Sequence, residues 1–232
     1  MSDLYILSGG AAQGLVTQLQ DRFTQKSGVG VKGTFGAVGM MKDKLLAGEP
    51  CDVMIVSDAM VRDLTGSGDL VAGSAQALGA VKTGVAVKTG EKPVDVSSPD
   101  ALKATLRAAR GIYFPDPIKA TAGIHVMKVL TALGLDVELA DRLRPYANGA
   151  TAMKAMADCA ETGLIGCTQA TEILFTEGVE LVAPLPKEFE LATVYTAAVC
   201  TKAGQPQAAR ELTTMLASAE FSAVRRDCGF EA

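Results

Sequence analysis

Apolar residues are spaced in two ways along this chain: in short unbroken runs and at helical intervals. The change from one spacing to the other marks the boundaries of the predicted elements. Short apolar runs are typical of strands that are buried on both faces of a sheet. Such runs lie at 4–7, 29–35, 51–57, 78–87, 111–114, 163–169 and 192–201. Between them, apolar residues recur at helical spacing, as Leu15, Leu19 and Phe23 do. We therefore expect an α/β fold with parallel-type sheets flanked by helices.

Helices are predicted in the segments between these strands. The expected positions are within 8–28, at about 39–47 and 58–65, within 97–109 and 116–134, at 150–158, and twice within 205–230. Ser98 is the expected N-cap of its helix, because a serine side chain accepts a hydrogen bond from the free N–H groups of a first turn. Pro206 is expected at the start of the penultimate helix.

The strand pattern also predicts two lobes. The β-rich run 78–87 contains no helix and is expected to cross into a second lobe, and the run 192–201 is expected to return. In this prediction residues 1–80 and 197–232 form a discontinuous first lobe, and residues 81–196 form the second. A cleft between two lobes is a preferred place for a small ligand, with hinge closure as the expected motion.

The composition of the chain argues against several classes of protein. The 232 residues are 48% hydrophobic and carry a net charge of −4, which argues against a nucleic-acid binder. The cysteines show no CxxC spacing, so neither a metal site nor a disulfide framework is expected. They are Cys51, Cys159, Cys167, Cys200 and Cys228. Met1 leads directly into a strand, so we expect a cytoplasmic protein; a periplasmic one is the alternative if a leader was trimmed.

Candidate chemistry lies in loops that follow strands and open helices. The loops are 8–14, 35–40, 116–123 and 167–172. Loops of this kind gather at the carboxyl ends of strands, where free N–H groups and the helix dipole favour an anion. Together they predict an anion-binding site that needs no cofactor and no metal.

Two stretches carry a resemblance to a known family. They are "FGAVGMMKDKLLAGEPCDVMIVSD" (35–58) and "DPIKATAGIHVMKVL" (116–130). Both resemble the molybdate-binding solute-binding proteins of ABC importers, and the likeness covers nearly the whole chain. The resemblance implies the two-lobed type II periplasmic-binding-protein fold, the Venus flytrap. It also implies ABC-transporter membrane subunits as partners if the protein is exported.

The departures from this family indicate a different ligand. Family members hold molybdate with serine hydroxyls and a tyrosine, whereas this chain has Ala11, Ala37, Val38 and Gly166 at the matching positions. A buried oxyanion needs donors for its oxygens. Fewer hydroxyls and more apolar surface suit a larger organic anion, a di- or tricarboxylate, with molybdate or tungstate as the alternative ligand.

The residues expected to serve this site come from all four loops. The predicted ligand-binding residues are Ser8, Gly9, Gly10, Ala11, Gln13, Thr34, Gly36, Ala37, Val38, Gly39, Lys119, Thr121, Ala122, Thr168 and Gln169. The candidates for moving a proton are Lys119, Glu172 and Cys167, an amine, a carboxyl and a thiol. The alternative for Glu172 is a structural role, as a carboxylate in the first turn of a helix, where the helix dipole favours a negative charge. The only histidine, His125, is a further cleft candidate.

The sequence is compatible with three functions. The wider superfamily that the chain resembles includes isomerases of unsaturated polycarboxylates, of the aconitate type. Such an enzyme removes a proton α to a carboxylate and returns it one carbon away, with anion clamps stabilising the developing charge. We favour this cytoplasmic isomerase. The alternatives are a solute-binding protein of a molybdate-type ABC transporter and a sensor domain.

Overall fold

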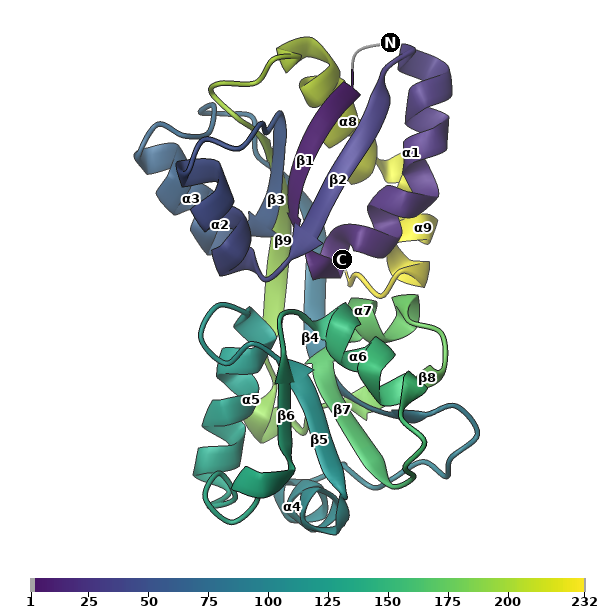
Figure 1. Ribbon diagram of the computed structural model, residues 1–232. Coiled ribbons are helices and arrows are strands. Elements are labelled where there is room, and N and C mark those ends of the chain that lie inside the picture. Colours follow the sequence, from purple (N-terminus) through teal and green to yellow (C-terminus); the bar gives the residue numbers. More distant parts are fainter. Residues whose placement is uncertain (1–2, 232) are drawn as a thin grey trace. The chain divides into compact units, whose positions relative to one another are not determined.

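The computed structural model describes residues 3–231 and divides into two compact units. Unit 1 comprises Met1–Val81 and Thr193–Ala232, and unit 2 comprises Lys82–Ala192. The chain enters unit 2 within strand β4 (Gln76–Lys88) and leaves it at the start of β9 (Ala192–Val199). These two strands are the expected β-crossovers, and each unit is an α/β unit (Figure 1). None of the helices in residues 3–231 is long and apolar enough to cross a membrane.

Unit 1 is built on a sheet with the strand order β2-β1-β3-β9. Its other strands are β1 (Asp3–Gly9), β2 (Gly30–Gly36) and β3 (Val53–Ser57). Strand β1 runs parallel to β2 and β3, whereas β9 runs antiparallel to β3. The parallel strands require helical crossovers, whereas β9, which lies between β3 and β4 in the strand order, adds an antiparallel neighbour to β3.

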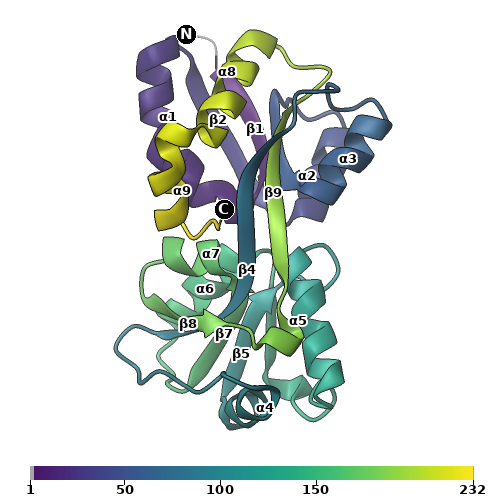
Figure 2. The same cartoon turned by 180° about the vertical axis from the view of Figure 1, so that it is seen from behind.

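Helices cover both faces of this sheet. They are η1 (Gly10–Ala12), α1 (Gln13–Ser27), α2 (Val38–Leu46), α3 (Asp58–Gly66), α8 (Pro206–Ala217), η4 (Ala219–Phe221) and α9 (Ser222–Asp227). Figures 1 and 2 show α2 and α3 on one face, with α1, α8 and α9 on the other. Pro206 is the first residue of α8, as predicted.

Unit 2 repeats this plan with the order β4-β7-β5-β6, and β8 pairs with β4. Its strands are β5 (Gly111–Pro115), β6 (Leu143–Tyr146), β7 (Leu164–Gln169) and β8 (Val179–Pro184). Its helices are α4 (Pro99–Ala108), α5 (Thr121–Ala132), η2 (Ala140–Arg142), α6 (Gly149–Asp158), α7 (Ala170–Phe175) and η3 (Lys187–Phe189). Ser98 caps α4 by accepting a hydrogen bond from the Ala101 N–H, which confirms that prediction.

Strands β6 and β8 are absent from the sequence-based prediction. Strand β6 is a short edge strand whose residues include Arg144 and Pro145, and much of β8 is only half-buried. Neither segment therefore shows the apolar run by which the other strands are recognised.

The core of unit 2 lies on two faces of its sheet. Ile165 and Cys167 of β7 pack on one face with Val126 of α5, and Leu164 packs on the other face with Met153 of α6. Successive strand residues point to opposite faces, which explains this division. The same alternation decides where the polar residues at the end of β7 point.

A buried carboxylate stabilises unit 1 at the end of the sheet where β1 and β3 begin. Asp52 precedes β3 and is buried. Its Oδ2 accepts the Tyr5 N–H at 2.7 Å, and its Oδ1 accepts the Gln205 N–H at 2.9 Å. One side chain thus joins β1, β3 and the residue before α8.

Replacing Asp52 with asparagine is expected to destabilise the protein by about 2–4 kcal/mol, because an amide N–H₂ would face a buried N–H donor. Chemical denaturation of both proteins measures the difference. The matched control is Asp63→Asn on an exposed position of α3, which should stay within about 0.5 kcal/mol of the wild type. Equal effects of the two substitutions would contradict this role of Asp52.

Candidate anion-binding site

The first two predicted loops lie next to each other in unit 1. They follow β1 and β2, where Gly9 and Gly36 are register partners. A Cβ on Gly9 would lie 2.9 Å from Cγ1 of Val38, so the two loops approach closely at this glycine. The helices that follow, α1 and α2, begin without a hydrogen bond from a capping side chain. The fold thus brings these two loops together.

The predicted residues of unit 1 differ in what they can offer a ligand. Ser8 is fully buried, and its hydroxyl donates to the Gly9 carbonyl at 2.9 Å, so its donor is used within the loop. Thr34 is exposed on β2. Gly9, Gly10, Ala11, Gly36, Ala37 and Val38 are buried, whereas Gln13 and Gly39 are partly exposed. Val38 belongs to the apolar core of the unit.

The third loop, in unit 2, is held by Asp116. Its Oδ1 accepts the N–H groups of Ile118 and Lys119 at 2.7 and 2.8 Å and so forms an Asx-type turn. A Cβ on Gly123 would lie 2.2 Å from the Asp116 carbonyl oxygen, so only glycine allows α5 to pack against this loop. Lys119 is exposed, Thr121 is half-buried and Ala122 is buried at the start of α5.

The fourth loop contains a buried carboxyl group with several donors. The Thr168 hydroxyl donates to Oε2 of Glu172 at 2.6 Å. A Cβ on Gly149 would lie 2.0 Å from the same oxygen, so a larger residue at the start of α6 would displace the carboxyl group or the Thr168 hydroxyl. Backbone N–H groups of Gly149, Ala150 and Gln169 also bond this carboxyl group. The Glu172 carboxyl group therefore accepts these hydrogen bonds at the start of α6, on the Leu164 face of the sheet.

Burial raises the pKa of the Glu172 carboxyl group, and the hydrogen bonds from Thr168 and the backbone N–H groups oppose that rise. Most of the hydrogen-bonding capacity of the Glu172 carboxyl group is used by donors within the protein. This geometry gives Glu172 a positioning role for α6 and α7, and its role as a proton carrier stays a prediction.

The expectation that Cys167 could act as an acidic thiol is wrong. Cys167 lies inside β7, opposite Val85, and belongs to an apolar cluster with residues of α4 and α5. Burial raises the pKa of its thiol to about 12. An apolar environment disfavours the thiolate, so this side chain packs in the apolar core as an un-ionised thiol.

Gln169 and Thr83 form a different kind of pair on the Cys167 face of the sheet. They are register partners between β7 and β4, one step beyond Cys167 and Val85. Gln169 is 3% exposed and Thr83 is 1% exposed. Neither polar atom of the Gln169 amide has a hydrogen-bond partner, and neither does Oγ1 of Thr83. Thr171 of α7 also has a buried hydroxyl without a partner.

Buried polar side chains are almost always hydrogen-bonded, so an unpartnered group calls for an explanation. The sequence predicted Gln169 but missed Thr83 and Thr171. The sequence contains a signal for Thr83: it occupies every second position of the strand-like run together with Val81, Val85 and Val87, and these positions share one face. A threonine in that apolar series indicates a polar position within a buried layer.

Other sequence candidates take structural roles. His125 Nε2 lies 2.7 Å from the Phe189 carbonyl oxygen, so the ring contacts the segment of η3. Asp58, the first residue of α3, forms an ion pair with Arg62 at 2.8 Å and accepts the Thr196 hydroxyl. Among residues 3–231, no group of three or more histidine, cysteine or acidic residues could hold a metal ion.

The comparison with known families covers nearly the whole chain. The family described as "Bacterial extracellular solute-binding protein" matches residues 4–231. This chain belongs to that family.

Individual relatives of this solute-binding family member differ in what they are named for. An aconitate isomerase from a Pseudomonas species is 26% identical over 239 residues, covering 100% of this chain and 88% of that protein. The periplasmic molybdate-binding protein of Azotobacter vinelandii has a TM-score of 0.81 at 19% identity, with 99% of each chain covered. A sulfate-binding protein of Mycobacterium tuberculosis has a TM-score of 0.77 at 15% identity, covering 99% of this chain and 86% of that one. The two structural likenesses show the fold, which is the predicted periplasmic-binding-protein fold.

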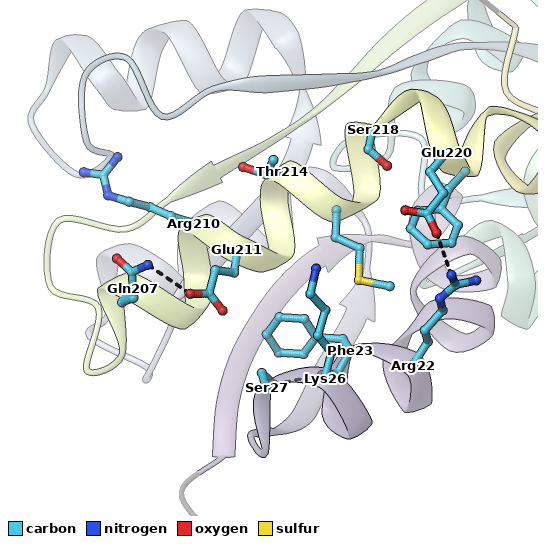
Figure 3. Close-up of a pocket in the computed structure, with 12 residues that line it drawn as sticks. Arg22, Phe23, Lys26, Ser27, Gln207, Arg210, Glu211, Thr214, Ser218 and Glu220 are labelled. Atoms are coloured by element: carbon cyan, nitrogen blue, oxygen red, sulfur yellow. Dashed lines mark hydrogen bonds and ion pairs between the residues drawn. The ribbon is translucent and has the colours of Figure 1, made fainter.

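A separate hollow of about 660 Å³ lies in unit 1 of this solute-binding family member, between α1 and α8 (Figure 3). None of the predicted anion-site residues lines it. An ion pair between Arg22 and Glu220 at 2.5 Å and a hydrogen bond from Gln207 to Glu211 lie along its wall. Its charged groups of both signs are partly paired with one another, which does not match the site expected for an anion.

The buried carboxyl group predicts a pH dependence of stability. The folded state raises the pKa of Glu172, so between the unfolded and folded pKa values the folded chain binds more protons. The contribution of Glu172 is therefore greatest below the unfolded pKa of about 4.3 and falls as pH rises through the folded pKa. Glu172→Gln should lose this dependence.

Chemical denaturation from pH 4 upward measures the difference in free energy of unfolding between the wild type and Glu172→Gln. The control, Glu177→Gln at an exposed position, should change with pH in parallel to the wild type. A wild type that gains stability over Glu172→Gln as pH rises would show that the sign is wrong.

Proposed function

We propose that this chain binds a small di- or tricarboxylate and isomerises it by moving a double bond. The observation that carries the proposal is the pair of unpartnered buried groups, Thr83 and Gln169. An amide N–H₂ and a hydroxyl donate to a carboxylate, and the amide oxygen accepts from a ligand hydroxyl or a protonated carboxyl group. A ligand would supply the partners that the fold does not.

The character of the loops in unit 1 supports an organic anion over a compact oxyanion. Ala11, Ala37 and Val38 carry no hydroxyl, and the Ser8 hydroxyl donates within its own loop. The backbone N–H groups of these loops can still bind one carboxylate end of the ligand. The expected cytoplasmic location remains part of the proposal.

The relative named aconitate isomerase supports the reaction class. In such a reaction a proton leaves the carbon next to the double bond. The electron pair spreads over the allylic system and its carboxylate, and a proton returns at the other end, so no atom is gained or lost. Lys119 is the candidate for moving the proton, since Cys167 is excluded by its burial and Glu172 is engaged at α6.

The second candidate is a solute-binding protein for an oxyanion such as molybdate, with ABC-transporter membrane subunits as partners. The similarity in fold to the molybdate-binding protein favours it. The same loops would then bind the oxyanion through backbone N–H groups. A thermal-shift screen of cis-aconitate, trans-aconitate, citrate, molybdate, tungstate and sulfate separates the two candidates. Stabilisation by the tricarboxylates supports the first, and stabilisation by molybdate alone contradicts it.

Thr83→Val and Gln169→Leu are expected to weaken tricarboxylate binding by about 10- to 100-fold, because each removes hydrogen-bonding groups to the ligand. Neither should lower the stability of the free protein, since the lost groups have no partner in it. Calorimetric titration and chemical denaturation measure the two effects. Thr214→Val on an exposed position of α8 is the control and should bind like the wild type. Unchanged affinity in both test variants would refute the pair's role.

Lys119→Arg is expected to slow isomerisation by about 100-fold or more while retaining binding, because arginine keeps the positive charge but does not release a proton near neutral pH. Proton NMR of cis- or trans-aconitate in deuterated water measures deuterium entering the ligand carbon. Full exchange activity in Lys119→Arg would exclude this amine as the proton carrier. A wild type that binds tricarboxylates without any exchange would make the protein a binder only.

A further inference from the structure

Two cysteines that are far apart in the sequence meet at one corner of unit 1. Cys51 and Cys200 are 149 residues apart, yet their Sγ atoms lie 3.2 Å from each other. Both are free thiols; Cys51 is 8% exposed and Cys200 is 2% exposed. Their spacing in the sequence gave no sign of this contact.

The backbone holds the two sulfurs together. Cys51 lies just before β3 and Cys200 just after β9, and these strands are antiparallel neighbours. The Cys200 N–H donates to the Asp52 carbonyl at 2.9 Å, which extends the pairing to the cysteines. A disulfide requires the sulfurs to approach to about 2.05 Å, so a shift of roughly 1 Å in side-chain position would join them.

A small reagent can reach the pair. Both cysteines line a hollow of about 210 Å³, whose wall includes Glu49, Asp69 and Lys202. The Cys200 thiol donates to Cys51 Sγ, and this hydrogen bond raises the pKa of Cys200. Cys51 is the more exposed residue of the two, so we expect it to meet a reagent first.

We propose that Cys51 and Cys200 form a redox pair that closes to an intramolecular disulfide by exchange with a small disulfide such as oxidised glutathione. The Cys51 thiolate attacks one glutathione sulfur and releases one glutathione thiol. The Cys200 thiolate then attacks Cys51 Sγ and releases the second. Two protein thiols are oxidised, one glutathione disulfide is reduced to two thiols, and the protein loses two hydrogen atoms.

Oxidation is the chemistry that this pair fits best. In the part of the chain that the structure describes, no third histidine, cysteine or acidic side chain joins the cysteines into a metal-binding group. The proposal also stands apart from the proposed function. The pair lies where β3 begins, whereas the first two loops follow the opposite ends of β1 and β2. Oxidation should thus leave anion binding by the protein unchanged.

The test is incubation of the folded, reduced full chain with oxidised glutathione, followed by intact-mass and non-reducing peptide mass spectrometry. The expected product is lighter by about 2 Da and contains one peptide pair joined through Cys51 and Cys200. Its midpoint of thermal unfolding should rise by about 5 °C or more, because the link closes a long loop. A stable glutathione adduct on Cys51, or no reaction, would overturn the proposal.

Cys51→Ser and Cys200→Ser should each abolish the loss of about 2 Da. Two variants are made so that the test still stands if one of them fails to fold. Cys159→Ser, at a half-buried cysteine outside the pair, is the control and should still form the link. A linked product that persists in both test variants would assign the oxidation to other cysteines.

Discussion

The alternation of side chains at the end of β7 is the constraint on which the proposed site depends. Thr168 and Gln169 are adjacent and both are buried, but the strand directs them to opposite faces of the sheet of unit 2. Thr168 meets Glu172 at the start of α6, where every donor finds an acceptor within the fold. Gln169 meets Thr83, where the polar atoms have no partner. The Thr168 hydroxyl thus bonds within the unit, whereas the amide of Gln169 is buried without a partner.

Two buried carboxyl groups of the protein, Asp52 and Glu172, take part in its scaffold. Asp52 and Glu172 are both buried, and each accepts backbone N–H groups from neighbouring elements. A buried charge is tolerated when several donors surround it. These carboxylates are therefore parts of the scaffold, one in each unit. In the proposed function, the groups assigned to the bound anion are uncharged donors, backbone N–H groups and Lys119.

Much of the fold could be predicted from the sequence, because the buried strands of parallel sheets are unbroken apolar runs. The edge strand β6 and the strand β8 were missed because their residues are half-exposed and mixed in character. The site was harder to predict. Side-chain type suggested Cys167 and Glu172 as reactive groups, but reactivity depends on burial and partners that only the fold supplies. Thr83 and the pair of Cys51 with Cys200 depend on strand register, which joins residues distant in the chain.

The most direct measurement of the central claim is NMR of the Gln169 side-chain amide during titration with cis-aconitate. The assignment follows from the loss of one amide signal pair in Gln169→Leu. If the ligand completes the hydrogen bonds of this group, the Gln169 signals will shift saturably with the same affinity as the binding measured by calorimetry. If the ligand binds while the Gln169 signals stay unchanged, the pair with Thr83 is not the recognition site and the account is contradicted.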